Sequence, residues 1–212
     1  MSNYLILLFA VALSISACRP STDKAEGIKT DAKIKEEAEK YFSASDFNPS
    51  SNLILVYNNV MMVNYYENDS LKVSFDEDDD KKQVFKSFYY TRHDTIIIDG
   101  AFGLFGGEGF SIHLVNNKAT LFLMVASDEF ATYAYQEDDP LTDKLEVPCT
   151  DTKIILSEIP SMDKNVTIYG YCEFKSNDYY SSRGFADGHE ILPRVKQRAE
   201  FSIYFKSNKL AL

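Results

Sequence analysis

Apolar and polar residues alternate in short runs from Leu53 onward, which is the pattern of β-strands. These runs are rich in Val, Ile, Phe and Tyr, and turn residues separate them at short intervals. The runs that we expect to form strands lie near residues 53–57, 60–66, 71–75, 84–90, 94–99, 108–114, 119–126, 131–135, 152–159, 166–175 and 195–206. Asn58-Asn59 and Asn116-Asn117 are candidate hairpin turns, because Asn tolerates a positive φ. The pattern predicts a mainly β fold, an antiparallel β-sandwich or barrel-like single domain with one short N-terminal helix.

The last of these runs has the clearest alternation between its two faces. The apolar face carries Val195, Ala199, Phe201, Ile203 and Phe205. The polar face carries Arg194, Lys196, Arg198, Glu200, Ser202, Tyr204 and Lys206. Burial of a single face fixes the register, because a slip by one residue would expose every apolar side chain. Residues 121–125 are apolar on both faces, which favours a central strand.

A short helix is expected before the strands. Thr30 can cap a helix that runs to about Ser45. One apolar stripe recurs at helical spacing and consists of Ile34, Ala38, Tyr41 and Phe42. Residues 19–29 are polar and mixed in charge, so we expect a flexible tether there.

The N-terminus carries a different signal. An unbroken apolar run extends from Leu5 to Leu13 and leads into Ile15-Ser16-Ala17-Cys18, small residues followed by a cysteine. The run has the length of the apolar region of a secretory signal and is too short to cross a bilayer as a helix. This layout resembles the signal peptide and lipobox of bacterial lipoproteins. Beyond residues 1–18 we recognise no family motif.

The resemblance implies that the chain is cut after Ala17, that a diacylglyceryl group joins the Cys18 thiol, and that the new amine is acylated. Several acyl chains anchor a protein stably, so the membrane becomes a partner through Cys18. The expected organisation is then a signal peptide (1–17), a lipidated tether with a short helix (18–49) and a β-rich globular domain (50–212). Arg19, directly after the cysteine, favours the outer membrane of a Gram-negative bacterium. The alternatives are a signal that is cleaved without lipidation and a short buried core segment.

Charge narrows the classes of partner. The chain has 22 Lys and Arg against 32 Asp and Glu, a net charge of −10. Nucleic acid is therefore not expected as a partner, because phosphate contacts need a basic surface. Acidity keeps the domain soluble and would also suit a cationic partner.

Two cysteines remain in the expected mature domain once Cys18 is lipidated. Export would place Cys149 and Cys172 in a compartment that permits a disulfide between them. Two buried, unpaired thiols are the other interpretation. No Cys-His spacing indicates zinc, and we predict neither a metal site nor a cofactor.

Two further patterns favour structural turns over cation-binding or phosphate-binding loops. The acidic run Asp76–Asp80 lacks the spacing of an EF-hand, so we interpret it as a solvated turn, with weak cation binding as the alternative. The glycines within Phe102–Phe110 do not form a phosphate-binding loop, and they indicate a tight turn or bulge. The sequence contains no Gly-x-Ser-x-Gly or His-Glu-x-x-His motif, and we predict no catalytic residue.

The strongest candidate for binding is residues 176–193, a long connection between two expected strands. Its candidate ligand-binding residues are Tyr179, Tyr180, Arg183, Asp187 and His189. Flat tyrosine rings with neighbouring hydrogen-bonding groups suit a sugar ring or a protein partner. A surface loop that packs only on itself is the alternative.

The basic stripe of Arg194, Lys196 and Arg198 is interpreted as offsetting carboxylates across the sheet, with a docking site for an acidic partner as the alternative. The sequence thus favours a non-enzymatic, lipid-anchored binding or interaction module for protein or glycan. A hydrolase that uses a glycosidase-like pair of carboxylates, or a structural subunit of the envelope, remains as an alternative.

Overall fold

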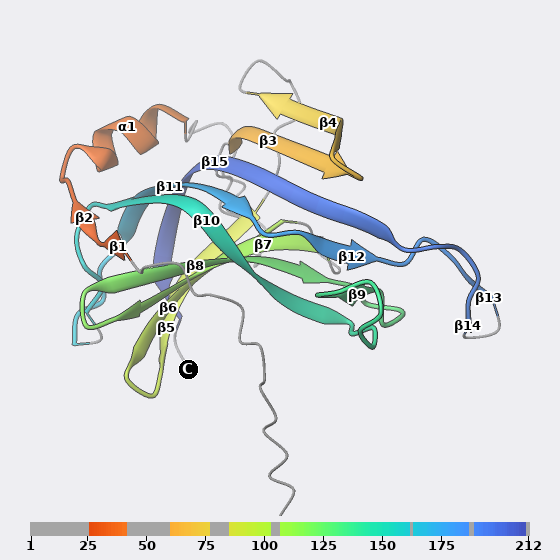
Figure 1. The fold of residues 1–212 in the computed structure, drawn as a ribbon. Coiled ribbons are helices and arrows are strands. Elements are labelled where there is room, and N and C mark those ends of the chain that lie inside the picture. Colours follow the sequence, from red (N-terminus) through yellow and green to blue (C-terminus); the bar gives the residue numbers. More distant parts are fainter. Residues whose placement is uncertain are drawn as a thin grey trace, which may run out of the picture.

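The computed structural model describes residues 26–41, 60–76, 85–102, 107–161, 163–186 and 189–210, and its fold is mainly β (Figure 1). The first strands are β1 (Glu26–Gly27), β2 (Lys29–Thr30), β3 (Val60–Glu67), β4 (Ser70–Asp76), β5 (Phe85–Arg92), β6 (Thr95–Phe102), β7 (Gly107–Val115) and β8 (Lys118–Ala126). They are followed by β9 (Tyr133–Ala134), β10 (Lys144–Leu156), β11 (Ile168–Ser176), β12 (Tyr179–Ser181), β13 (Phe185–Ala186), β14 (His189–Glu190) and β15 (Val195–Lys209). The predicted fold class, a barrel-like β domain with one short helix, is confirmed.

Seven of the described strands close into a ring in the order β8, β7, β6, β5, β15, β11 and β10. The ring closes because β10 is long and bent. Its first part, Lys144–Pro148, pairs with β8, and its second part pairs with β11 from Cys149 onward. The register shifts after Thr150, and Asp151 has a positive φ of 48° in this bulge. All neighbours in the ring are antiparallel except β15 and β5, which meet in parallel at Asn208 and Lys209.

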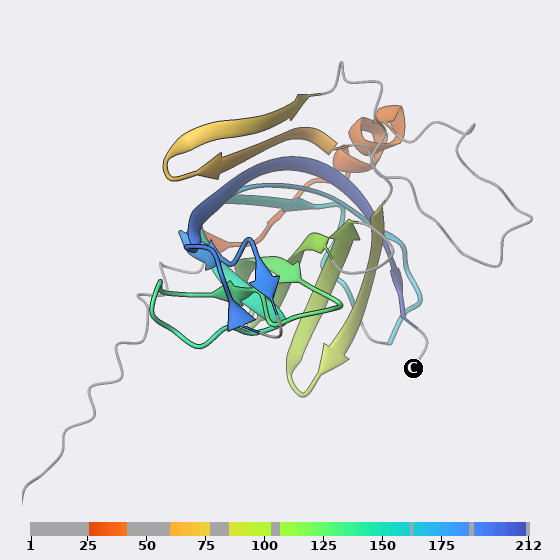
Figure 2. The same cartoon turned by 90° about the vertical axis from the view of Figure 1, so that its right-hand side faces the viewer.

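The β3–β4 hairpin extends the sheet from β15, along whose arch it lies in Figure 2. Asn68 and Asp69 form its two-residue turn, with φ of 47° and 64°. The predicted turn at Asn116-Asn117 is confirmed between β7 and β8, with φ of 50° and 62°. The Asn58-Asn59 turn and the strand at 53–57 lie outside the described residues.

The core fills the ring with side chains from alternate positions of its strands. Phe110 and Phe205 are fully buried, and their ring centroids are 5.2 Å apart. Each ring covers a glycine on a neighbouring strand. A Cβ at Gly100 would lie 2.3 Å from Phe110 Cε1, and a Cβ at Gly170 would lie 2.2 Å from Phe205 Cζ. These two glycines therefore leave room for the rings that close the core.

The sheet differs from the expectation mainly at β10, which begins at Lys144 rather than at 152. Pro148 and the bulge at Asp151 interrupt the alternation of apolar and polar residues. The sequence pattern of the first half of β10 therefore does not predict a strand. The last strand follows the prediction at Ala199, Phe201, Ile203 and Phe205, which are buried. It departs from the prediction at Val195, which is only partly buried, and at Ser202, which is buried on the polar face.

Helix α1 (Ile34–Tyr41) packs its two buried residues, Ile34 and Ala38, against Tyr169 of β11. Its cap is Asp31 rather than the expected Thr30, since Asp31 Oδ1 accepts a hydrogen bond from the Lys33 amide at 2.9 Å. Thr30 instead belongs to β2. Residues 26–29 were expected within a tether, but β1 pairs with β8 and β2 pairs with β10. The described part of the chain holds no helix that is long and apolar enough to span a membrane.

Candidate functional site

The segment predicted as a binding loop, residues 176–193, is largely built of strands. β12 pairs with β15 on one side and with β9 on the other. Beyond it, β13 and β14 form a small hairpin that projects from the ring in Figure 1. We call residues 182–194 the arm. Because β12 is part of the sheet, the arm starts from a fixed base.

Tyr179 and Tyr180 point to opposite faces of β12, as neighbours in a strand must. Tyr179 is only 1% exposed and belongs to the core, whereas Tyr180 is half-buried on the other face. The expectation that both tyrosines offer flat faces to one ligand is therefore wrong for Tyr179.

Tyr179 meets a carboxyl group inside the ring. Glu108 lies on the core face of β7, in phase with Phe110 and Ile112. The hydroxyls of Tyr65 and Tyr179 lie close enough to its carboxylate to lower the pKa of Glu108 as hydrogen-bond donors. Tyr133 of β9 completes the group, with its ring centroid 6.3 Å from that of Tyr179. We call Glu108, Tyr65, Tyr133 and Tyr179 the Glu108 cluster.

Burial governs the electrostatics of this cluster. It raises the pKa of Glu108, against the opposing effect of the hydrogen bonds from Tyr65 and Tyr179. Burial, and next the charge of Glu108, raise the pKa of all three tyrosines, so their hydroxyls stay protonated. The site is thus an interior acid that gains a proton more readily than an exposed Glu.

A carboxyl with a raised pKa can serve as a general acid, but a glycosidase needs a second carboxylate beside it. No other carboxylate of the described residues contributes to the pKa of Glu108. The part of the chain that the structure describes also contains no group of three or more His, Cys, Asp or Glu that could hold a metal ion. The cluster therefore joins β3, β7, β9 and β12 by hydrogen bonds and tyrosine rings without forming a pair of acids.

Glu108 was not predicted as a site residue, although the sequence contains a pattern that indicates it. It alternates with Phe110, Ile112 and Leu114, so it is a charged residue on an apolar face. We placed it at the start of the expected strand 108–114, but within a glycine-containing segment interpreted as a turn or bulge, of which residues 103–106 lie outside the described part. Only the fold brings Glu108 to Tyr65, Tyr133 and Tyr179.

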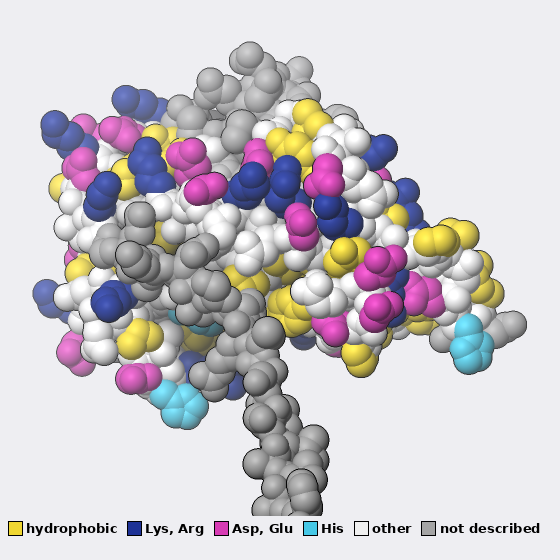
Figure 3. Space-filling view, in the orientation of Figure 1, with side chains coloured by type: hydrophobic (Ala, Val, Ile, Leu, Met, Phe, Trp, Pro, Cys, Tyr) yellow, Lys and Arg dark blue, Asp and Glu magenta, His cyan; other side chains and the backbone are white. Residues whose placement is uncertain are grey.

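The arm carries an exposed apolar surface. Phe185 stacks on Phe130, with ring centroids 5.4 Å apart and an interplanar angle of 24°. Phe130 is 51% exposed, Ile191 58% and Leu192 49%. We call Phe130, Phe185, Ile191 and Leu192 the arm patch, and Figure 3 shows hydrophobic side chains gathered on the projecting arm.

Polar contacts hold the arm in place. Arg194 Nε donates to both carboxylate oxygens of Glu190, at 3.1 and 3.2 Å. Its Nη1 donates to the carbonyl of Glu137 and to that of Asp139 at 2.6 Å. The Ile191 amide donates to the Gly184 carbonyl at 3.0 Å. The arginine thus ties the far strand of the arm to the loop after β9.

The other predicted binding residues do not converge with Tyr179. Arg183 forms an ion pair with Glu67 at the end of β3, and His189 is exposed in β14. Asp187 lies outside the described residues. Tyr179 is therefore excluded from a surface site with the others, and a ligand site at Tyr180, Arg183 and His189 stays a prediction.

Both cysteines of the globular domain are free thiols in the structure. Cys149 lies opposite Ser176, whereas Cys172 lies opposite Ile154, so the two do not face each other across the strand pair. Burial raises the pKa of both thiols. Of the two interpretations, the structure has the unpaired thiols.

The basic stripe on β15 has local partners. Lys196 Nζ is 2.6 Å from a carboxylate oxygen of Asp69, and the Arg198 guanidinium lies 4.5 Å from the centroid of the Tyr66 ring. With Arg194 bound to Glu190, the interpretation that this stripe offsets nearby carboxylates is confirmed for Arg194 and Lys196, whereas Arg198 packs on a tyrosine ring. Cys18 and residues 77–80 of the acidic run lie outside the described residues.

Comparison with family models, with curated proteins and with solved structures finds no match for this chain.

Proposed function

We propose that this protein is a non-enzymatic binding module of a bacterial cell envelope, anchored by lipid on Cys18, that binds another protein through the arm patch. One observation carries the proposal. Phe130, Ile191 and Leu192 are each about half exposed at the arm, and the Arg183–Glu67 ion pair and the hydrogen bond from Arg194 to the Asp139 carbonyl tie the arm to neighbouring elements.

Exposed apolar side chains that lie together favour binding, because covering them releases water from their surface. Single exposed apolar residues are ordinary, but here Phe130 and Phe185 stack while Leu192 packs over Gly184. A fixed surface also loses little conformational entropy when a partner covers it. The arm therefore has the properties of a contact surface for a protein.

A protein suits this surface better than a glycan. Sugar rings bind to exposed aromatic faces with hydrogen-bonding groups beside them. Tyr179 is buried, the chain has no Trp, and two of the four side chains in the arm patch are aliphatic. Aliphatic side chains of a partner would match them.

The anchor would keep the ring close to the bilayer. Glu26 of β1, which pairs with β8, follows Cys18 by eight positions in the sequence. An extended chain of that length spans no more than about 28 Å. A lipid on Cys18 would therefore limit the arm to partners that are near or within the same membrane.

Photocrosslinking in intact cells tests the proposal. A photoreactive amino acid replaces Ile191 in the arm, and in a control variant it replaces Ile159, which is 41% exposed in the connection after β10. We expect a discrete protein adduct at position 191 and none at 159. Equal labelling at both positions, or adducts with carbohydrate alone, would contradict the proposal.

The anchor is tested separately with Cys18→Ser. We expect this variant to leave the membrane fraction, together with loss of the lipid mass from the N-terminal peptide. Unchanged partitioning would remove the anchor from the proposal while leaving the arm in place.

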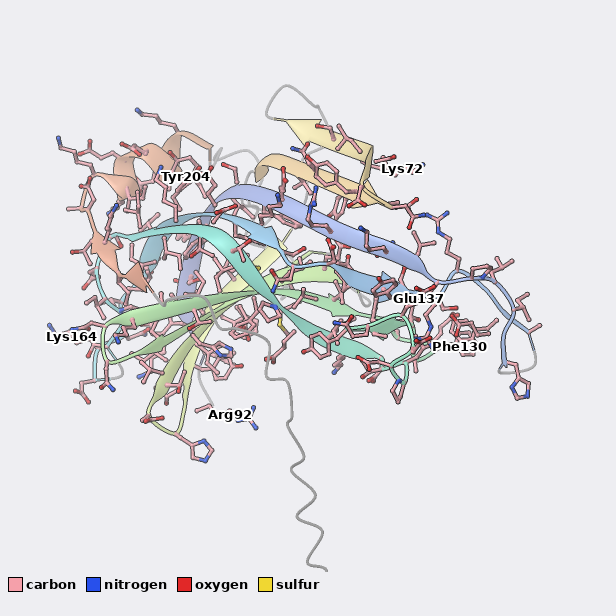
Figure 4. All side chains as sticks on the ribbon, in the orientation of Figure 1. Lys72, Arg92, Phe130, Glu137, Lys164 and Tyr204 are labelled. Carbon is pink, nitrogen blue, oxygen red and sulfur yellow. The ribbon has the colours of Figure 1, made fainter. Side chains whose placement is uncertain are left out.

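A structural role in an envelope assembly is the second candidate, and β4 favours it. Among the described strands β4 pairs only with β3, and Leu71 and Val73 are 54% and 40% exposed on it. Such an edge can accept a strand from another chain. Lys72, labelled in Figure 4, lies between them and opposes this use, because an edge lysine discourages pairing. A crosslink at Leu71 in place of Ile191 would favour the structural role.

A further inference from the structure

An acidic border lies next to the arm patch. The stretch 127–143 contains six carboxylates and no Lys or Arg. Five of these residues are exposed, and we call them the acidic rim: Asp128, Glu129, Glu137, Asp138 and Asp143. Asp128 and Glu129 directly precede Phe130 of the patch, and the Glu137 carbonyl binds Arg194 of the arm. The rim and the patch are therefore parts of one surface, and Figure 4 labels Phe130 and Glu137 close together at the arm end of the ring.

The two arginines of the arm are engaged. Arg194 is bound to Glu190, and Arg183 is paired with Glu67. Lys144 follows the stretch at the start of β10 and is the nearest Lys along the sequence. Among the described residues, none of the five rim carboxylates takes part in an ion pair. Figure 3 accordingly shows acidic side chains grouped beside the apolar ones at this end.

We propose that the partner presents a cationic amphipathic segment, whose apolar side chains cover the arm patch while its Lys and Arg side chains face the acidic rim. This inference deepens the proposed function and rests on it. The two halves of the surface have different roles. Covering the patch supplies most of the affinity, because exposed charge pairs contribute little each. The rim orients the segment and speeds its approach, and salt weakens this contribution.

A second copy of this chain suits the surface poorly. Two arm ends would bring two acidic rims together, on a protein whose net charge is −10. An anionic lipid surface is disfavoured for the same reason. The occupant that satisfies both the apolar and the acidic part of the surface is a segment that is apolar on one face and basic on the other.

A synthetic peptide provides the test. The probe is a short helix of Leu and Lys with its leucines on one face, labelled with a fluorophore, and its counterpart has Glu at every Lys position. Binding to the full-length protein purified in detergent is followed by fluorescence anisotropy at low and at high salt. We expect the Leu/Lys peptide to bind, the Leu/Glu peptide not to bind, and salt to weaken the complex.

Matched variants assign the contact. Ile191→Asp in the patch should weaken binding about tenfold or more. Ile159→Asp should not weaken binding, because Ile159 follows the C-terminal end of β10, whereas the rim precedes its N-terminal end. Glu137→Gln with Asp138→Asn in the rim should weaken binding several-fold and reduce its salt dependence. Glu158→Gln with Asp163→Asn removes the same charge near Ile159 and should have no such effect.

Three results would overturn the inference. These are equal binding of the two peptides, equal effects of the rim and control variants, and self-association of the protein that Ile191→Asp abolishes. The proposed function can fail on its own, since it depends on the crosslink at Ile191 in cells. If a partner crosslinks there but keeps its affinity in the rim variant, the proposed function holds and the cationic segment is wrong.

Discussion

Replacing Tyr179 with Ala should destabilise the protein strongly, because this tyrosine is a core residue and not a surface platform. Its side chain is 1% exposed, and its hydroxyl lies near the carboxyl of Glu108. Removing a buried aromatic ring costs about 3–5 kcal/mol, and loss of the hydrogen bond adds about 1–2 kcal/mol. A domain of this size loses about 2–4 °C of melting temperature per kcal/mol. We therefore expect thermal unfolding at least about 6 °C below that of the wild type.

Two variants separate the contributions to this loss. Tyr180→Ala, on the opposite face of β12, should cost only about 1 kcal/mol or less, because that side chain is half-buried. Tyr179→Phe keeps the ring and removes the donor, so it should cost about 1–2 kcal/mol. It should also raise the pKa of Glu108 further, because the Tyr179 hydrogen bond lowers that pKa. If urea unfolding finds Tyr179→Ala as stable as Tyr180→Ala, the placement of Tyr179 in the core is refuted.

Three further predictions concern the ring. Burial raises the pKa of Glu108 above its ordinary 4.5, so its stabilising contribution is full below that pH and is lost as the pH rises through the raised value. Glu108→Gln should therefore gain stability relative to the wild type as the pH rises from 4.5; a difference that is constant with pH in urea unfolding would contradict this. Gly170→Ala should cost about 1–3 kcal/mol in thermal unfolding, because the new Cβ would lie 2.2 Å from Phe205 Cζ; an unchanged melting temperature would show that the ring moves freely. Cys149 and Cys172 should both react with iodoacetamide after unfolding without reductant, and a peptide that links them would show a disulfide instead.

The fold could be predicted where one rule decides the outcome. On β15 the buried face follows from period-2 alternation alone, and the Asn116-Asn117 turn follows from the tolerance of Asn for positive φ. The start of β10 could not be predicted in this way. Pro148 and Asp151 are residue types that usually interrupt a strand. In the structure they lie where β10 leaves β8 and bends toward β11. The bend depends on both partner strands, which no local window contains.

The same limit explains the site. The segment that forms the arm could be predicted as a binding candidate, because long connections between strands are unusual. The sequence does not show which side chains of this segment face the core. Tyr179 and Tyr180 are the same residue type and adjacent in the chain. Only the pairing of β12 with β15 and β9 decides which of the two side chains is buried. Arg183 was predicted as a binding group, but in the structure it is paired with Glu67, which is distant from it in the sequence.

Glu108 and the arm patch depart from the sequence pattern in opposite ways. Glu108 places a charge on a face that is otherwise apolar, and two tyrosine hydroxyls offset part of its burial. Ile191 and Leu192 place apolar side chains where solvent reaches them, and nothing in the described structure covers them fully. The first departure is compensated by tyrosines of β3 and β12, which both pair with β15. The second is not compensated within the described part of the chain, so it is the arm, more than the interior acid, that gives a reason to look for a partner.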